Sequence, residues 1–343
     1  MLRTSYCLLL ALLTMPVYAV GDVASDDPDN EFLELDLEQL LATKVDPHLA
    51  SVLESHIHRR EERMLSIMRT SRDKRASSED TELVLNEYPM APTDMQSESY
   101  LVSGMFAWSD RGTAMVMIPF EARSMDNTAA TGEITSDRVS GVGDITLMAN
   151  YVVKESASHR LIIQTAASIP TGSIDERGVS ATGAGGRLPY AMQLGSGTLD
   201  VRPGLMYQFT ADPWSLGLQA TADVRFGKNS NSYRLGNRLD LKAWLAHEWT
   251  PFFASVLKLG FHDQDPIEGA DPELDAALTP AANPRLVGGQ SLDAHVVTEL
   301  YTSSPRAEAL RLSLDIGFPL REKHAEPHLE TDWYSTLALQ WTF

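Results

Sequence analysis

Polar residues alternate with apolar residues in many segments, and several of them are charged types whose spacing could support chemistry. Paired carboxylates can act as a general acid and a general base. Here the acids are interspersed with arginines and lysines, which favours salt-bridge networks along one wall and, in a channel, control of selectivity. If these segments close into a barrel, the candidate lumen-lining residues are Arg202, Asp223, Arg225, Asp240, Lys242, Glu248, Lys258, Asp293, Glu299, Arg311 and Asp315.

Two groups of residues carry side chains that can bind metals. His56 and His58 would share one side of an extended segment and are weak candidate ligands, but two solvated residues beside a barrel rim is the stronger interpretation. Thioethers bind soft Cu(I), yet methionine is also a flexible apolar filler, which is the interpretation that we favour. The methionines concerned are Met64, Met68, Met90, Met95, Met105, Met115, Met117 and Met125.

Hard-cation and cofactor sites are not predicted. The acids of segment 263–289 offer oxygen ligands to a cation such as Ca²⁺, but they lack the spacing of a calcium-binding loop, so we expect a solvated loop. The sequence contains neither a phosphate-cradling glycine loop nor zinc-ligand spacing. We therefore predict no cofactor and no metal.

An enzymatic role is the weakest alternative. Outer-membrane phospholipases are barrels with a Ser–His dyad, but no serine here is joined to a histidine and an orienting side chain. His247 lies beside Trp249 at a position that suits a lipid interface. We predict that the chain is not an enzyme, with a barrel lipase or esterase as the least favoured alternative.

The segments that must position these residues alternate between apolar and polar residues with a period of two. The end of the chain shows this best: Leu337 and Leu339 share one face with Trp341 and Phe343. An apolar face that ends in a C-terminal phenylalanine is typical of a lipid-facing strand. We therefore predict that Trp341 and Phe343 form the assembly signal of an outer-membrane barrel.

About twelve such segments follow, each near the length that a tilted membrane-spanning strand needs. Short and long connections alternate between them, as they do in barrels with short periplasmic turns and long external loops. The expected long connections are 71–97, 122–141, 170–197, 227–236, 263–289 and 319–330. The predicted strands begin near Glu61, Ser99, Thr113, Val142, His159, Thr198, Pro213, Asn237, Phe252, Gln290, Glu308 and Thr331. The predicted fold class is all-β, a transmembrane antiparallel up-and-down β-barrel.

The chain before the barrel divides into two parts. Residues 1–19 read as a secretory signal peptide with Arg3, a short apolar run and a small-residue cleavage site. Residues 20–60 form an acidic segment with a short helix, which we expect in the periplasm or as a plug, and residues 61–343 form the barrel. The net charge of −19 argues against a nucleic-acid partner. Cys7 is the only cysteine and lies in the predicted signal peptide.

Several stretches resemble the family of outer-membrane proteins named for the MetA-pathway of phenol degradation. Residues 140–147 contain Gly141-Val142-Gly143-Asp144, and the following strand ends in Pro170-Thr171-Gly172. Further similar stretches are 172–177, 188–190, 192–197, 233–236 and 329–333. The resemblance covers roughly residues 100–343 and implies an outer-membrane barrel labelled a transporter, with no catalytic residues to carry over.

We predict an outer-membrane channel for passive passage of a small solute, with hydrophobic and aromatic compounds included. The alternative is a non-conducting barrel that acts as a structural or partner-binding element. The expected partners are outer-membrane lipid, the barrel-assembly machinery and a small-molecule solute. The expected location is the outer membrane of a Gram-negative cell, reached through the signal peptide.

Overall fold

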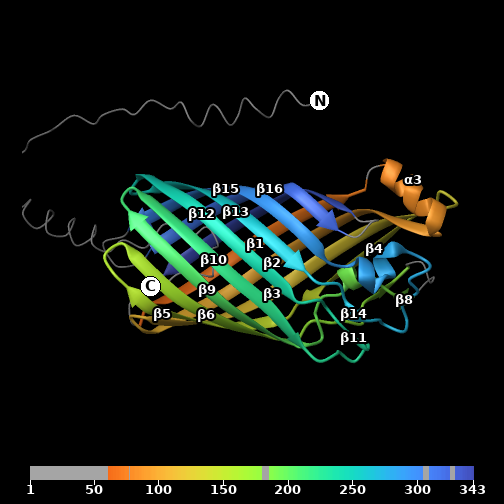
Figure 1. Cartoon of the computed structure of the whole chain (residues 1–343), viewed down its shortest axis with the longest axis horizontal. Helices are drawn as coiled ribbons and strands as arrows, with labels where there is room; N and C mark the ends of the chain where they lie inside the picture. The colour runs from red at the N-terminus through yellow and green to blue at the C-terminus, as the bar shows by residue number, and fades with distance from the viewer. Residues whose placement is uncertain (1–60, 77, 180–184, 304–308, 325–328) are drawn as a thin grey trace, which may run out of the picture. The chain divides into compact units, whose positions relative to one another are not determined.

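The structure is a computed structural model, and it describes residues 61–343 except 77, 180–184, 304–308 and 325–328. Within these residues, twelve long antiparallel strands close into a barrel because β1 pairs with both β2 and β17 (Figure 1). The strands are β1 (Arg63–Arg75), β2 (Met90–Ser109), β3 (Gly112–Ala129), β5 (Ile145–Glu155), β6 (His159–Ile169), β9 (Leu199–Ala211), β10 (Trp214–Phe226), β12 (Arg238–Thr250), β13 (Phe253–Gln264), β15 (Gly289–Ser303), β16 (Ala309–His324) and β17 (Glu330–Thr342). The predicted barrel of about twelve strands is confirmed.

Three of the predicted long connections were wrong in part. In 71–97, β1 continues to Arg75, a helix α3 (Ser78–Glu87) follows, and β2 starts at Met90 rather than near Ser99. In 122–141, β3 continues to Ala129 and an extra strand β4 (Ile134–Val142) pairs with its second half. In 319–330, β16 (Ala309–His324) continues through the first half of the segment. Polar residues occupy both faces of these extensions, so the sequence lacks the one-sided apolar pattern that marks a lipid-facing strand.

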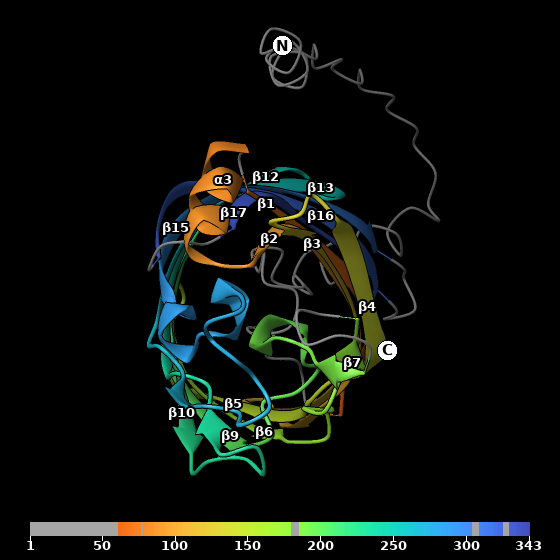
Figure 2. The same ribbon diagram turned by 90° about the vertical axis from the view of Figure 1, so that its right-hand side faces the viewer.

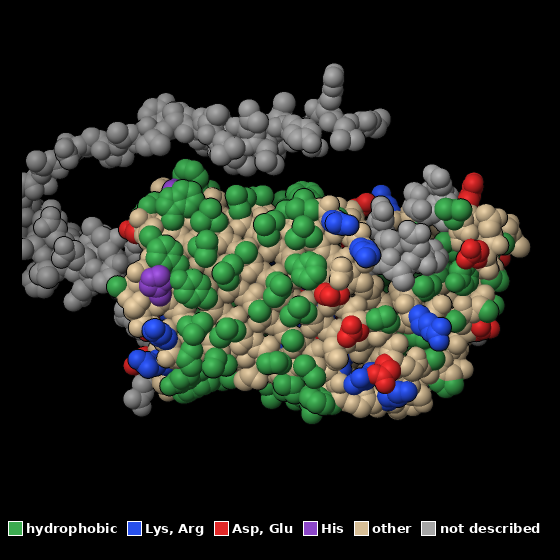
Figure 3. Space-filling view, in the orientation of Figure 1, with side chains coloured by type: hydrophobic (Ala, Val, Ile, Leu, Met, Phe, Trp, Pro, Cys, Tyr) green, Lys and Arg blue, Asp and Glu red, His purple; other side chains and the backbone are tan. Residues whose placement is uncertain are grey.

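The strands alternate as the sequence predicts. Along β10, residues facing outward are exposed and those between them are buried, and the exposed set includes Leu216 and Leu218. Figure 3 shows the result on one face of the barrel, where apolar side chains cover the wall and most charged side chains lie toward its ends. Exposed tryptophans lie near the short-turn end of the barrel, at Trp108, Trp214, Trp249 and, close to the end of β17, Trp341. Such an aromatic girdle is typical of a barrel in a membrane.

The inward side chains pack closely in the half of the barrel near the short turns. One cluster joins Val152, Ile162 and Met206 to residues of β12, β13 and β15. The inward side chains of Val152, Ile162, Met206 and Val297 are almost fully buried, so little open space is left beside them. The lumen is therefore a packed, narrow interior in this half, as expected for a small barrel.

Long loops cover the opposite end and carry short elements of their own. Strand β7 (Arg177–Gly178) pairs with β8 (Gly186–Arg187), and β11 (Tyr233–Arg234) pairs with β14 (Glu268–Gly269). Three 3-10 turns complete them: η2 (Tyr190–Met192), η3 (Pro280–Ala282) and η4 (Pro284–Leu286). Figure 2, a view along the barrel from this end, shows loop segments lying within the ring of strands. Among the residues described, no helix has the length and apolarity to cross a membrane.

Candidate functional site

The first pair of predicted lumen residues forms a two-point salt bridge. Arg202 on β9 donates from Nε to Oδ1 of Asp223 on β10 at 2.5 Å and from Nη2 to Oδ2 at 3.0 Å. Arg225 donates from Nε to Oδ2 of Asp200 at 3.3 Å. Parallel guanidinium–carboxylate bonds fix both side chains, so they brace neighbouring strands as well as placing charge in the lumen.

A histidine joins two of the predicted acids. His262 on β13 contacts Asp240 on β12 through Nδ1, and its Nε2 lies 3.2 Å from Oδ2 of Asp293 on β15. Asp240 also accepts from Arg238 at 2.6 Å, and Tyr334 donates to Asp293 at 3.2 Å. His262 was not among the predicted residues. The network ties three consecutive strands together on the lumen side.

The remaining predicted acids also meet cations. Lys258 forms an ion pair with Asp315, although β13 and β16 are separated by β15, so both side chains must reach across the lumen face. His295 Nδ1 lies 2.8 Å from Oδ1 of Asp315. Arg311 pairs with the fully buried Glu299.

Lys242 and Glu248 complete the predicted set. They occupy the same alternate positions of β12 as Asp240, which meets His262 inside the barrel. By alternation and burial, the eleven predicted residues occupy inward positions of their strands, and that they line the path of a solute stays a prediction. Their control of selectivity stays a prediction.

The glycine-rich motif at 141–144 forms a junction that holds a long loop against the wall. We call Asp144, Gly172 and Ser196 the Asp144 junction: Asp144 accepts from Gly172 N at 2.9 Å and from Ser196 N at 2.7 Å. Thr171 adds a bond from its Oγ1 to Gly143 O at 2.8 Å. A Cβ at Gly195 would lie 2.5 Å from Gly172 O, so only glycine permits this approach.

The loop held by this junction turns into the barrel. Arg123 on β3 donates from Nη1 to Ala191 O at 2.8 Å and to Gln193 O at 2.5 Å. Met192 beside them is fully buried in a cluster that includes Met95 of β2 and Met125 of β3. The loop is therefore anchored to both the polar and the apolar parts of the inner wall.

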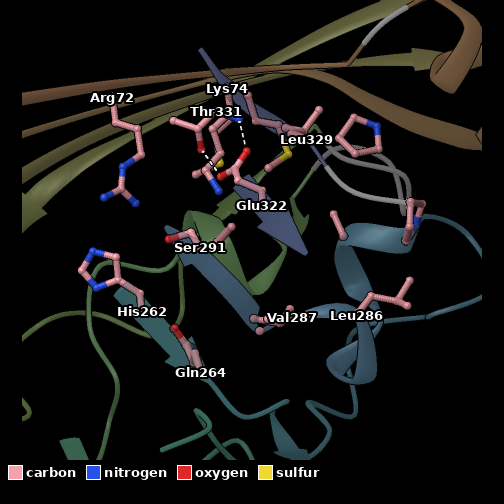
Figure 4. A pocket seen from close by; sticks show the side chains of 18 of the residues that line it. Arg72, Lys74, His262, Gln264, Leu286, Val287, Ser291, Glu322, Leu329 and Thr331 are labelled. Carbon is pink, nitrogen blue, oxygen red and sulfur yellow. Dashed lines mark hydrogen bonds between the residues drawn. The ribbon is translucent and has the colours of Figure 1, made fainter. Parts of the chain in front are cut away.

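The inward loop borders a cavity of about 290 Å³, which we call the chamber (Figure 4). Its walls come from the long-loop ends of β1, β2, β3, β12, β13, β15, β16 and β17 and from the turns η3 and η4. One side is polar and includes Arg72, Lys74 and His262, which Figure 4 shows around the space. The other side is apolar and consists of Pro92, Met95, Met125, Ala191, Pro280, Ala281, Leu286, Val287 and Leu329.

Arg72 and Lys74 differ from the other lumen cations. Among the described residues, neither forms a salt bridge or hydrogen bond, and the one specific contact of Arg72 is with the ring of Tyr334, 4.6 Å from the guanidinium carbon to the ring centre. Glu322 also lines the chamber, but its carboxylate accepts from Thr331 N and Thr331 Oγ1, both at 2.8 Å. The chamber therefore holds two cations without a carboxylate partner.

The loops above the chamber are interlocked by charge. Arg187 is buried and contacts Asp175, Asp271 and Glu273, which joins the loop 170–198 to the loop 265–288. Bonds donated by Asn231 and Arg187 lower the pKa of Asp175, and bonds donated by Arg177 and Arg187 lower the pKa of Glu273. Acids of the segment 263–289 are thus used in part to hold loops together.

Methionines form an apolar stretch of the inner wall. Met64, Met105, Met115 and Met148 lie opposite one another on β1, β2, β3 and β5, one on each successive strand. They are buried in one cluster together with Met117. This packing agrees with the interpretation of methionine as an adaptable apolar filler.

Other expectations have different outcomes. His56 and His58 lie outside the described residues, as do the signal peptide and the segment 20–60. Within the described ranges, no group of three or more His, Cys, Asp or Glu is placed to hold a metal ion. Trp341 and Phe343 are exposed, with ring centres 4.7 Å apart, and their role in assembly stays a prediction.

Arg72 and Lys74 were missed because β1 was expected to end before them. Counting by twos from Met64 and Met68 along β1 reaches both residues. This alternation was the signal that could have placed them inside the barrel. Arg123 also fell in a predicted connection. The loops that close the chamber could not be placed by periodicity, because their positions depend on contacts with distant strands.

Comparison with known proteins gives one family and one fold. Residues 112–316 match the family described as "Putative MetA-pathway of phenol degradation". The crystal structure of the COG4313 outer membrane channel from Pseudomonas putida F1 is similar with a TM-score of 0.57 and 16% identity, over 88% of this chain and 100% of that chain. At this identity the likeness establishes the fold alone.

A second solved structure is more distant. The Pseudomonas aeruginosa FadL homologue has a TM-score of 0.41 and 10% identity, over 82% of this chain and 90% of that chain. A likeness at this level supports no functional comparison. No curated protein has a significantly similar sequence.

Proposed function

Because the chain belongs to the MetA-pathway of phenol degradation family, as its resemblance predicted, we propose that it is an outer-membrane channel. It passes a small solute without an energy source, and hydrophobic and aromatic compounds are among the solutes that suit it. The proposal includes delivery by the signal peptide and insertion by the barrel-assembly machinery, which reads the end of β17. The short turns then face the periplasm and the loops face the exterior.

The observation that carries this proposal is the composition of the lumen from one end to the other. A chamber with apolar and cationic walls lies beneath the loops, and methionines line part of the interior nearer the short turns. Thioether side chains adapt to varied apolar surfaces and make favourable contacts with aromatic rings. An apolar solute therefore meets a compatible wall along the methionine-lined part of the lumen, while the charges carried by β9 to β16 are paired with one another.

A non-conducting barrel is the second candidate, and the packed interior near the short turns favours it. The inward side chains of Val152, Met206 and Val297 are almost fully buried, so little open space is left beside them. Passage would require these side chains to move aside. Conduction measurements separate the two candidates.

The test is planar-bilayer conductance of the refolded protein without residues 1–19, compared with a version that starts near Arg59. Conductance steps in both versions are expected from an open channel. Steps only in the shorter version would identify residues 20–60 as a plug. Silence from both, with heat-modifiable migration on a gel showing a folded barrel, would contradict the channel and support the non-conducting candidate.

A further inference from the structure

We propose that the chamber selects small organic monoanions with an apolar body, of which an aromatic carboxylate is the simplest. This inference rests on the proposed channel function and names the class of solute for its loop-covered end. The chamber offers two kinds of surface to one bound molecule: a cationic side for the acid group and an apolar side for the body. Neither a neutral hydrocarbon nor an inorganic anion would use both.

The cationic side has charge that the protein leaves available. Arg72 and Lys74 are two positions apart on β1 and line the same cavity. Within the described part of the chain, no carboxylate forms an ion pair with either of them. Lys258 and Arg311, which lie nearer the short turns, each have such a partner, as does Arg225 at the long-loop end of β10. Glu322 and Asp293 attract both cations without pairing with them, and a bound carboxylate in direct contact would relieve more of their mutual repulsion.

The carboxylates near this side are already engaged. Glu322 accepts two hydrogen bonds from Thr331, and Asp293 interacts with His262 and Tyr334. Asp240 interacts with Arg238 and His262. The sequence as a whole has a net charge of −19, so this cationic wall runs against the general charge of the protein. The contrast favours a site for an anion over an accidental surface.

The apolar side is formed by parts of the fold that are held firmly. Met95 and Met125 pack with the buried Met192 of the inward loop, which Arg123 anchors through backbone carbonyls. Leu286 and Val287 of the loop 265–288 also line this side of the chamber. A volume of about 290 Å³ lies near the lower end of the range for ligand pockets, so the body must be small.

The contact between Arg72 and Tyr334 shows how the cationic side could hold an acid group in one position. Tyr334 holds its ring beneath the guanidinium of Arg72, which limits the movement of the cation while its donors stay available. A planar guanidinium offers a carboxylate two parallel hydrogen bonds, whereas the ammonium of Lys74 acts as a point charge. The pair can therefore fix the acid group and leave the body to contact the methionines.

The experiment is isothermal titration of the refolded protein without residues 1–19, using sodium benzoate and, as a neutral probe of similar size, benzyl alcohol. The main variant is the double substitution Arg72→Gln and Lys74→Gln. The matched control is Arg69→Gln, on the outward face of the same strand, where Arg69 pairs with Glu98. Removing Arg72 and Lys74 charges leaves no carboxylate stranded, so the double variant should fold, and heat-modifiable migration checks this.

We expect benzoate to bind more tightly than benzyl alcohol, and the double variant to lose benzoate affinity by about tenfold or more, as loss of charge-assisted hydrogen bonds implies. Arg69→Gln should bind benzoate like the unmodified protein. Equal affinity for the two probes, or unchanged benzoate affinity in the folded double variant, would overturn the inference. Lys74→Met alone gives a second folded variant and should show a smaller loss.

The outcome is separable from that of the channel proposal. Conductance together with equal affinity for benzoate and benzyl alcohol would support the channel and contradict the chamber as its selective site. Benzoate binding that depends on Arg72 and Lys74, without conductance, would support the site and contradict passage.

Discussion

At the scale of single residues, the lumen charges serve two purposes. Pairs such as Arg202 with Asp223, and Lys258 with Asp315, hold strands together while they keep charge inside the barrel. Arg72 and Lys74 lack such a partner among the described residues and are therefore the cations most available to a solute. Alternation in the sequence identified the paired residues, but pairing itself requires distances between strands.

Asp144 gives the first prediction at this scale. Asp144→Ala removes the acceptor for two backbone N–H groups, of Gly172 and Ser196. Leaving such donors without a partner costs about 1–3 kcal/mol, so the urea concentration at the unfolding midpoint should fall. Asp144→Asn keeps one amide oxygen as an acceptor, so its unfolding midpoint should fall less than that of Asp144→Ala. The same midpoint in all three proteins would show that the junction does not stabilise the fold.

Gly195 gives the second prediction. In Gly195→Ala the new Cβ would lie 2.5 Å from Gly172 O and 2.7 Å from Asp144 Oδ1, so the junction must open. We expect faster cleavage of the loop 170–198 in limited proteolysis. Gly104→Ala is the control, because its Cβ would meet nothing nearer than Leu65 Cδ2 at 3.8 Å. Equal cleavage of the two variants would argue against the close approach.

At the scale of elements, the strands that cross the apolar band could be predicted and their extensions could not. A strand with lipid on one side and a polar interior on the other has a strong two-residue period, as in β10 and β17. The last residues of β1 and the first residues of β2 have polar groups on both faces, so their period is hidden. The helix α3 is short and polar and gave no signal.

The candidate site follows the same division. Residues in the middle of strands, such as Asp240 and Asp293, were identified because alternation places them inside. The chamber was not predicted, because it depends on where β1 ends and on how the loops fold inward. Loop positions are set by contacts such as Arg123 with Ala191 O, which join residues far apart in the sequence.

The interlocked loops give a prediction of pH dependence. Asp175 and Glu273 have pKa values lowered by their hydrogen-bond partners, so each stabilises the folded loops when ionised. Their stabilisation is present above the ordinary pKa of an acid, about 4, and is lost as the pH falls through the lower folded value. We expect the loops to become accessible to pepsin in this acidic range.

A variant tests whether these acids are responsible. Glu273→Gln removes one charge that Arg177 and Arg187 share, so pepsin should cut the loops at a higher pH than in the unmodified protein. Asp275→Asn removes an acid from the same loop with little change of shape and serves as the control. It should leave the pH profile of cleavage unchanged. A profile that is identical for Glu273→Gln and the unmodified protein would contradict the predicted contribution.

At the scale of the whole described barrel, apolar and charged surfaces are arranged along one direction. On the face shown in Figure 3, the outer wall is apolar between two regions of charge. The interior changes from a packed apolar region to the chamber beneath the loops. Membership of the family and the fold agree with this arrangement. The central claim is that solutes pass through the lumen and meet the chamber on their way.

Modification of a single introduced cysteine tests this claim most directly, because Cys7 lies in the predicted signal peptide. Ala191→Cys places a thiol on the chamber wall, and Val179→Cys places one on an exposed part of the same loop away from the chamber lining. Both proteins are labelled with a negatively charged methanethiosulfonate, and labelling is verified by mass. The account predicts a lower unit conductance for labelled Ala191→Cys and no change for labelled Val179→Cys. Unchanged conductance in fully labelled Ala191→Cys would contradict passage through the chamber.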